Sequence, residues 1–443
     1  MSGATNLDEE WVEKLKYRLS VIKKHENVRV SGQEPTMFEV SKILRDAQPK
    51  AYEPKIVSLG PYHYHKPHLR AMNQQHKWSL LNKLLDQDRS KDLKYYLKVI
   101  KDNETRARNA YPTQSMIGIC ENQFVTMMLL DCVFVIEILW LWKKSPEGIK
   151  NLVFMSEQRS QIIVARDMLL LENQLPFFLI ETLFDSAFTG HPGVRGKLKS
   201  WLGEFFSGFL DSKISQVPNV DSAATERTDR HQSITRLGWI PSATRLEETR
   251  IKFRRNKSPT DAQLLGITFE KGFLKGVLTI PQFEVDDDTN ILFRNLIALE
   301  QCDIRNIADV GAPFTAYVFF MSCIIHTAAD VEILQRNDII ISGIGSNRQV
   351  ARLFNSLCKE VVVDSDKCYL SQVVKEVNAH SNSIWKSWWA ELIYKYFRTP
   401  WSFISFAAAF LFFTMAVVQL TFTIKNYKLQ IINYKLQVNK THQ

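Results

Sequence analysis

The chain has 443 residues, of which 45% are hydrophobic and 23% are charged, so its composition excludes a protein that is disordered throughout. Its 17 Gly and 15 Pro residues make up about 7% of the chain, against about 12% in an average protein, and this shortage of turn residues disfavours many-turned β-sandwiches and barrels. Six cysteines without a CxxC pair indicate neither a zinc module nor a dense disulfide scaffold. The sequence therefore predicts a mainly α fold.

Residues 1–50 are predicted to form an N-terminal extension that contains an amphipathic helix. The apolar residues that share one face of this helix are Trp11, Leu15, Leu19 and Ile22. No uninterrupted apolar run is present here, so the stretch is not a signal peptide. A large helical domain is expected to follow over residues 51–398.

Apolar residues that recur every three or four positions predict several helices in the first half of this domain. The expected ranges are 67–86, 90–108, 121–143 and 156–186, the last bent at Pro176 because proline lacks a backbone donor. Residues 211–235 are polar and aperiodic, and we expect a mobile surface loop there.

The pattern changes over about residues 249–285, where alternating residues and the punctuating Gly272 and Gly276 predict a small antiparallel β element. Asp286 to Thr289 then supply candidate N-caps for a further helix. Two more helices are expected over 314–336 and 347–361.

The segment Trp401 to Ile424 has 24 residues and no charge, which is long enough as a helix to cross a membrane about 30 Å thick. Two other apolar stretches compete with it. Residues 124–142 contain two acidic residues, which are costly in a bilayer, so this stretch is assigned to the protein core. Residues 313–329 lack charge but are short for a span. A single C-terminal transmembrane helix is expected.

Residues 425–443 form a short basic tail after the predicted span. Because no N-terminal signal is found, we expect insertion as a tail anchor in the plasma membrane or an endomembrane, with the main domain in the cytosol. The lysines of the tail favour the opposite orientation by the positive-inside rule. Two sequons, at Asn103 and Asn439, are candidate glycosylation sites that become modified only in the secretory lumen.

The formal net charge of +9 is concentrated near the predicted span. Residues 381–443 hold seven Lys or Arg against one Glu. Anionic lipid headgroups explain this excess better than nucleic acid does, so the membrane bilayer is an expected partner and nucleic acid is not.

Histidines gather at His63, His65 and His68, with His76 on the helix that follows. Their spacing is compatible with a metal site, and together with Glu172 they form the basis of an alternative hypothesis, a membrane-bound hydrolase or metalloenzyme. No paired carboxylate or Cys completes a zinc set, and no HExxH, GxSxG, P-loop or kinase signature occurs. We therefore expect neither an enzyme nor a cofactor, and no small-molecule substrate is evident.

Other polar motifs have structural interpretations. Glu121-Asn122-Gln123 and Glu172-Asn173-Gln174 are predicted to tie helices together through hydrogen bonds to backbone ends. The Asp286 to Asp288 run indicates a helix start more than a calcium site. The turn Gly343-Ile344-Gly345 is a weak match to a phosphate-binding turn.

A basic run begins at Arg250 and continues with Lys252, Arg254 and Arg255. These four residues are candidates for contact with a protein partner or a lipid headgroup. A cationic edge strand that is protected from aggregation is the simpler structural explanation.

Several stretches together resemble one family, the plant membrane-associated proteins called domain of unknown function 247. The matching stretches are 57–78, 167–184, 242–255, 276–302 and 347–361, together with the C-terminal apolar helix. The resemblance implies a helical domain with a membrane anchor in a land plant, and no known catalytic activity. It also implies a link to recognition, because some grass members are implicated in pollen self-incompatibility. A membrane-anchored, non-enzymatic protein that recognises an unknown protein partner is the expected function.

Overall fold

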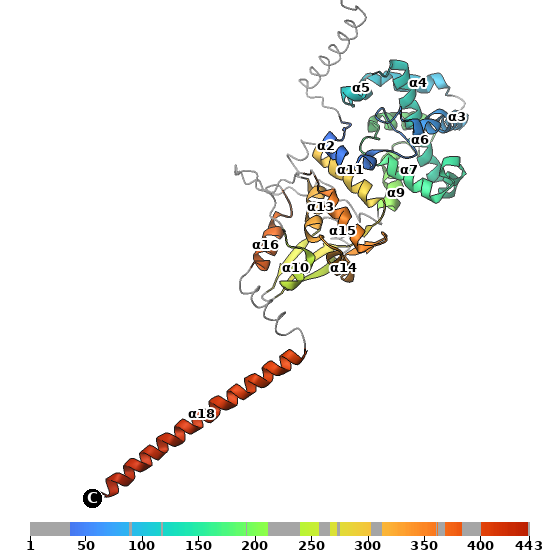
Figure 1. Ribbon diagram of the computed structural model, residues 1–443. Helices are drawn as coiled ribbons and strands as arrows, with labels where there is room; N and C mark the ends of the chain where they lie inside the picture. Colours follow the sequence, from blue (N-terminus) through green and yellow to red (C-terminus); the bar gives the residue numbers. More distant parts are fainter. Residues whose placement is uncertain are drawn as a thin grey trace, which may run out of the picture.

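A computed structural model describes residues 36–87, 91–116, 118–191, 193–210, 240–256, 266–272, 275–302, 312–359, 361, 368–382 and 400–441 (Figure 1). The predicted N-terminal helix and the predicted loop over 211–235 lie outside these residues. Helices dominate and the strands form two small sheets, so the predicted mainly α fold class is confirmed.

The first half of the described chain is helical. Its helices are α2 (Lys42–Ala47), α3 (Lys77–Gln87), α4 (Leu93–Asp102), α5 (Glu104–Asn109), α6 (Glu121–Lys144), α7 (Gln158–Met168), α8 (Phe177–Ala187) and α9 (Leu198–Leu210). Short 3-10 turns occur at Pro49–Tyr52, Pro67–Leu69, Thr113–Met116, Pro146–Asn151 and Val153–Met155, and a π-helical turn, Met72–His76, leads directly into α3.

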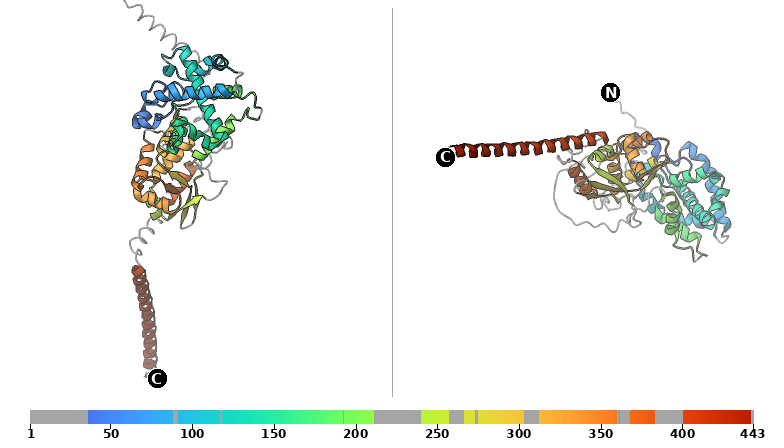
Figure 2. Two further views of the ribbon diagram at one scale, coloured as in Figure 1. Left: turned by 90° about the vertical axis from the view of Figure 1, so that its right-hand side faces the viewer. Right: turned by 90° about the horizontal axis from the view of Figure 1, so that it is seen from below.

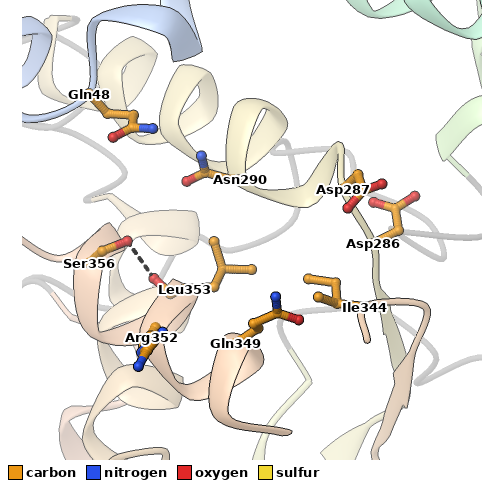
Figure 3. Close-up of a pocket in the computed structure, with 9 residues that line it drawn as sticks. All are labelled: Gln48, Asp286, Asp287, Asn290, Ile344, Gln349, Arg352, Leu353 and Ser356. Atoms are coloured by element: carbon orange, nitrogen blue, oxygen red, sulfur yellow. Dashed lines mark hydrogen bonds between the residues drawn. The ribbon is translucent and has the colours of Figure 1, made fainter. Parts of the chain in front are cut away.

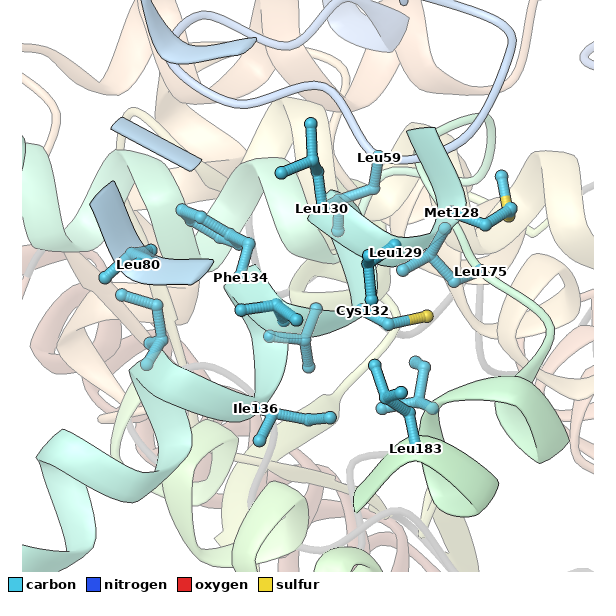
Figure 4. Close-up of a cluster of buried hydrophobic side chains, with 14 of the residues drawn as sticks. Leu59, Leu80, Met128, Leu129, Leu130, Cys132, Phe134, Ile136, Leu175 and Leu183 are labelled. Atoms are coloured by element: carbon cyan, nitrogen blue, oxygen red, sulfur yellow. The ribbon is translucent and has the colours of Figure 1, made fainter. Parts of the chain in front are cut away.

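Helix α6 is the centre of the first hydrophobic core. It packs against α3, α4 and α8, and 83% of its most apolar window is buried. Leu129, Phe134 and Ile136 contribute to this core, as Figure 4 shows. The assignment of residues 124–142 to the protein core is therefore confirmed, because surrounding helices, in place of lipid, cover the apolar surface.

The predicted bent helix over 156–186 is instead two helices. Helix α7 ends at Met168, and α8 begins directly after Pro176, which lacks the N–H that a continuing helix needs. The eight residues between them have irregular backbone, and their polar side chains take part in a buried cluster described below.

The second half of the chain combines helices with strands. Its elements are α10 (Ala243–Glu248), β1 (Ile251–Asn256), β2 (Thr268–Lys271), β3 (Gly276–Pro281), β4 (Phe283–Val285), α11 (Thr289–Cys302), α13 (Pro313–Ile324), α14 (Ala328–Arg336), β5 (Ile340–Ser342), α15 (Asn347–Leu357) and α16 (Ser371–Ser381). A second hydrophobic core lies among them, as the lower lobe in Figure 1.

The predicted β element is present, but its pairing is mixed and not purely antiparallel. The sheet has the order β1-β3-β2, in which β2 pairs with β3 antiparallel while β1 pairs with β3 in parallel, Ile251 opposite Gly276. The strands β4 and β5 form a separate parallel pair. A parallel pair needs a long connection, and the whole of residues 257–275 separates β1 from β3.

The predicted helix over 314–336 is divided into α13 and α14, which meet at an angle of 109°. The break is explained by a capping box, in which the side chains of Thr327 and Asp330 cap the start of α14. Helix α13 is largely buried in the second core.

A few polar contacts join the two cores. Asn295 of α11 donates to the carbonyl of Ala51 at 2.9 Å and accepts the N–H of Leu171 at 2.9 Å. Arg166 of α7 contacts Asp288, just before α11, at 3.2 Å. The amide of Asn295 is therefore fully used in this joint, whereas the buried Nε of Arg166 has no hydrogen-bond partner among the described residues.

The C-terminal helix α18, Pro400–Thr441, has 42 residues and extends away from the two lobes in both views (Figure 2). At 1.5 Å per residue it is about 63 Å long, roughly twice the thickness of a hydrocarbon core. The predicted span over 401–424 lies within it.

Candidate functional sites

A buried polar cluster holds the backbone of residues 55–60. The N–H groups of residues 55, 56 and 57 all donate to one carboxylate oxygen of Asp167, at 2.7 to 3.1 Å. Asn173 accepts the N–H of Leu59 at 2.6 Å and donates to the carbonyl of Val57 at 3.0 Å. Asp167 lies at the end of α7, and Asn173 lies in the irregular segment that follows it. Hydrogen bonds to residues 55–59, which are distant in the sequence, therefore hold the irregular segment in place.

Lys77 and Asp131 complete this cluster. Lys77, the first residue of α3, forms an ion pair with Asp131 of α6 and also donates to the carbonyl of Ser58 at 2.5 Å. The other oxygen of Asp131 accepts the N–H of Gly60 at 2.8 Å. Burial lowers the pKa of Lys77 and raises the pKa of Asp131, and the attraction between the two charges opposes both effects.

Gly60 is required by its surroundings. Its φ of +71° is a conformation that residues with a side chain rarely adopt. A Cβ at this position would also lie 2.8 Å from the hydroxyl of Tyr111 and 3.0 Å from the carbonyl of Gln174. The hydroxyl of Tyr111 donates to that carbonyl at 2.9 Å. The two groups closest to Gly60 are therefore held together by their own hydrogen bond.

His63 lies next to Glu172 but is not hydrogen-bonded to it. The two side chains are 3% and 1% exposed, and His63 Nε2 is 3.8 Å from Glu172 Oε2. Burial, with smaller contributions from the nearby Lys66 and Arg45, lowers the pKa of His63 to about 4. His63 is therefore neutral at neutral pH, and Glu172 instead forms its ion pair with Arg45 of α2.

The three histidines of the proposed metal site are not brought together. His63 is buried, whereas His65 and His68 are exposed, and His68 Nε2 is 3.0 Å from the carbonyl of Pro54. Within the part of the chain that the structure describes, no group of three His, Cys, Asp or Glu side chains could hold a metal ion. The metalloenzyme hypothesis therefore gains no geometric support from these histidines.

The prediction for the second Glu-Asn-Gln motif is confirmed. Asn173 and Gln174 bind the last carbonyls of α7: Asn173 donates to Asp167 at 2.7 Å, and Gln174 donates to Met168 at 2.8 Å. The first motif differs, because Glu121 lies on the surface and pairs with Lys101.

Sequence reasoning treated Glu137 as a cost of membrane insertion and missed its unusual environment. Its side chain is fully buried in α6, where Gln87 donates to both carboxylate oxygens at 3.2 and 3.3 Å. Burial raises the pKa of Glu137 to about 7. The detectable signal was an acidic residue inside a strongly apolar helix, a pattern that also marks catalytic acids.

A pocket of about 370 Å³ lies on the surface between the start of α11 and α15 (Figure 3). Its lining residues are Gln48, Asp286, Asp287, Asn290, Ile344, Gln349, Arg352, Leu353 and Ser356. The carboxylate of Asp286 accepts the N–H groups of Asp288 and Thr289 at 3.1 and 3.0 Å. The interpretation of this acidic run as a helix start is thus confirmed, and the turn at Gly343 to Gly345 borders the same pocket through Ile344.

The basic run lies on β1, which is an edge strand of its sheet. Lys252 and Arg254 point away from the core while Ile251 and Phe253 point into it. Arg254 forms an ion pair with Glu270 of β2 and donates to Thr279 at 3.1 Å. Arg250 precedes the strand with a positive φ of 62°. A contact of this strand with a partner remains a prediction.

The two sequons lie in different environments. Asn103 joins α4 to α5, and its side-chain amide donates to the carbonyl of Val99 at 3.0 Å. Asn439 lies within α18, near its end. Glycosylation of Asn103 would require its amide nitrogen to leave that hydrogen bond.

Helices α6 and α18 are both long and apolar enough to cross a membrane, but only α6 is covered by protein. None of the apolar window Ile404–Ile431 of α18 is buried against the rest of the described chain. The pair α13 and α14 would also pass this test if it were one bent span. The predicted C-terminal candidate is therefore the one whose apolar surface lacks a protein cover.

In a comparison with known proteins, residues 37–415 match the model of the DUF247 family, which is described as a plant protein of unknown function. This match covers most of the chain. The chain belongs to the DUF247 family.

Two DUF247 relatives from Arabidopsis thaliana illustrate the similarity. The chain is 30% identical to UPF0481 protein At3g47200 over 409 residues, which cover 84% of this chain and 82% of that protein. It is 22% identical to the putative UPF0481 protein At3g02645 over 484 residues, covering 85% and 88% of the two chains. No solved structure matches the chain.

The stretches that carry the DUF247 resemblance meet in space at the buried polar cluster. Asp167 and Asn173 of one stretch bind the backbone N–H groups of Val57 and Leu59, at the start of another. Asn295, in a third stretch, binds the backbone of Leu171. These residues therefore act in holding the fold together.

Proposed function

We propose that this protein is a membrane-anchored, non-enzymatic recognition protein, in which α18 crosses the bilayer and the helical body binds a protein partner. One observation carries the proposal: α6 and α18 are both apolar enough to span, yet 83% of the apolar window of α6 is buried and 0% of that of α18. A helix that is apolar on all sides needs either protein or lipid around it.

The absence of an enzymatic role is supported by how the polar residues are used. Asp131, Asp167 and Asn173 have their oxygens engaged with backbone N–H groups. The pocket beside α15 is lined by Asp286, which caps a helix, and by none of the histidines of the metal hypothesis.

We place the body on the cytosolic side as part of the proposal. None of the six cysteines forms a disulfide, and Cys132 and Cys323 are buried. Buried thiols that are not joined in disulfides suit a reducing compartment. The lysines after the span favour the opposite orientation, and the sequons at Asn103 and Asn439 distinguish the two orientations.

Anchoring is tested in the full chain with charges placed in the span. The change Phe410→Arg with Val417→Arg costs about 2.5–3.5 kcal/mol per charge near the bilayer centre, and we expect the protein to leave the carbonate-resistant membrane fraction. The matched control adds one arginine outside the span, Tyr427→Arg, and is expected to stay in the membrane. Equal behaviour of the two variants would contradict anchoring through α18.

Recognition is tested at the edge strand β1. We expect Lys252→Glu to weaken capture of an acidic partner from plant membranes, because Lys252 is exposed on β1, an edge strand of its sheet among the described residues. The matched control is Lys271→Glu, an exposed lysine on β2 at the other edge of the same sheet. A partner retained equally by both variants would exclude β1 as its binding surface.

A further inference from the structure

Helix α18 carries a regular row of uncharged polar residues. These are Gln419, Thr423, Asn426, Gln430, Asn433 and Gln437, which alternate in steps of four and three. This is the spacing of a heptad repeat, which keeps residues on one side of a helix. We call these six residues the amide seam. It begins inside the predicted span and continues into the tail.

The sequence of the tail repeats with the same period. Asn-Tyr-Lys-Leu-Gln occurs at 426–430 and again, seven residues later, at 433–437. In a strict seven-residue repeat, equivalent residues return to the same side of the helix every two turns. Such a repeat is typical of helices that wind around a partner helix.

The first residue of the seam lies in hydrocarbon if α18 spans the membrane. Gln419 is five residues before Ile424, about 7.5 Å inside the predicted end of the span. Its side chain is exposed on α18, as are those of Asn426 and Gln430. A side-chain amide in a bilayer is stabilised by hydrogen bonds to a neighbouring helix.

We propose that α18 pairs in parallel with α18 of a second copy of this chain along the amide seam. This inference rests on the proposed membrane anchor. In a parallel pair each seam residue faces its own counterpart, and an amide can bond to an identical amide because it both donates and accepts. Anchoring in one bilayer also raises the effective concentration of the two helices.

The charges of α18 favour a second copy as the occupant. At 100° per residue, Lys428 lies about 200° from both Asn426 and Gln430, on the side of the helix opposite the seam. Two copies that pair along the seam therefore keep Lys428 of one copy away from Lys428 of the other, and the seam ends at Gln437, because Lys440 occupies its next position. A pair along the lysine side would bring the two Lys428 residues together, which is unfavourable.

The test uses the full chain with donor and acceptor dyes on separate copies, reconstituted in phosphatidylcholine vesicles. Energy transfer is measured as the protein is diluted with lipid. The variant Gln419→Leu keeps an apolar span but removes the amide, and Gln430→Lys places two like charges opposite each other. One interhelical hydrogen bond in a bilayer averages about 0.6 kcal/mol, so Gln419→Leu should weaken association about threefold.

Each variant has a matched control. Thr421→Leu makes a comparable polar-to-Leu change in the same span, about 200° from Gln419 and Thr423, and Thr421 already donates to the carbonyl of Val418 at 2.7 Å. Leu429→Lys adds the same charge as Gln430→Lys, one residue outside the seam. We expect both controls to associate like the parent chain.

The outcomes distinguish a failure of helix pairing from a failure of membrane anchoring. Association that is weakened about threefold in Gln419→Leu, and weakened in Gln430→Lys, but unchanged in the controls supports the paired helix. Three results would overturn the paired helix. The protein could float with the vesicles but show no energy transfer, the controls could lose transfer as much as the variants, or transfer could require added plant membrane proteins. Flotation is read on the same vesicles, and a parent chain that does not float contradicts the anchor itself.

Discussion

Lys77 and Asp131 form an ion pair in the first core, with side chains that are 1% and 2% exposed. The pair does more than cancel two charges, because it also binds the backbone of Ser58 and Gly60. It thereby fastens the loop of residues 55–60 between α3 and α6. Removing one partner leaves the other charge buried, which is strongly unfavourable.

We therefore expect Lys77→Met to lower the free energy of unfolding by about 3–5 kcal/mol. Urea unfolding of the full chain in detergent, followed by tryptophan fluorescence, measures this change. The control is Lys66→Met, which breaks a pair with Glu53 whose side chains are 35% and 39% exposed; such pairs contribute at most about 1 kcal/mol. Similar losses in both variants would contradict a special role for Lys77.

His63 is expected to make the fold sensitive to acid. Its pKa falls from 6.5 to about 4 on folding, so the folded chain binds fewer protons between these values. Stability is therefore lost as the pH falls from 6.5 towards 4, by roughly 3 kcal/mol in total.

The variant His63→Gln should remove this part of the pH dependence, which unfolding midpoints measured at pH 7 and pH 4.5 would reveal. His65→Gln serves as the control, since His65 is exposed. A parent chain and His63→Gln that respond identically to pH would contradict the prediction.

Glu137 is expected to act in the opposite direction. Its pKa rises from 4.5 to about 7 on folding, so the folded chain binds more protons in this window and stability falls as the pH rises through it. Glu137→Gln should be more stable than the parent at pH 8, by up to about 3 kcal/mol, and no more stable at pH 4.5. Thermal melts at both pH values test this, with the exposed Glu121→Gln as a control that should be nearly neutral.

The orientation of the chain can be measured with its own sequons. With the body in the cytosol, a glycosidase-sensitive gel shift in plant cells should disappear in Asn439→Gln and persist in Asn103→Gln. The reverse pattern would place the body in the lumen. Protease protection of sealed vesicles gives an independent measurement, because a cytosolic body is digested while a lumenal one survives.

Local sequence patterns predicted the long elements well. The long apolar run of α6 and the charge-free segment within α18 were both recognised, and the two acids inside the run of α6 correctly separated the buried helix from the candidate span. The family could also be identified from the sequence. These features are decided by residues that are close together in the chain, so no tertiary information is needed to recognise them.

The rest depended on contacts between distant residues. The parallel pairing of β1 with β3 could not be read from alternation alone, because both pairings show the same period. The separation of α7 from α8 depends on Asp167 and Asn173 binding residues 55–59, more than a hundred positions away. The separation of the three histidines has a similar origin, since His63 is buried while His65 and His68 are exposed.

The π-helical turn Met72–His76 has a consequence for insertions and deletions. A π turn accommodates one more residue than an α turn, so it sets the rotation of α3 relative to the chain before it. Losing one residue here would allow an ordinary helix to form but would rotate Lys77 by about 100° away from Asp131. The length of this segment is therefore as much a part of the fold as its residues, and a deletion should be less tolerable than a substitution.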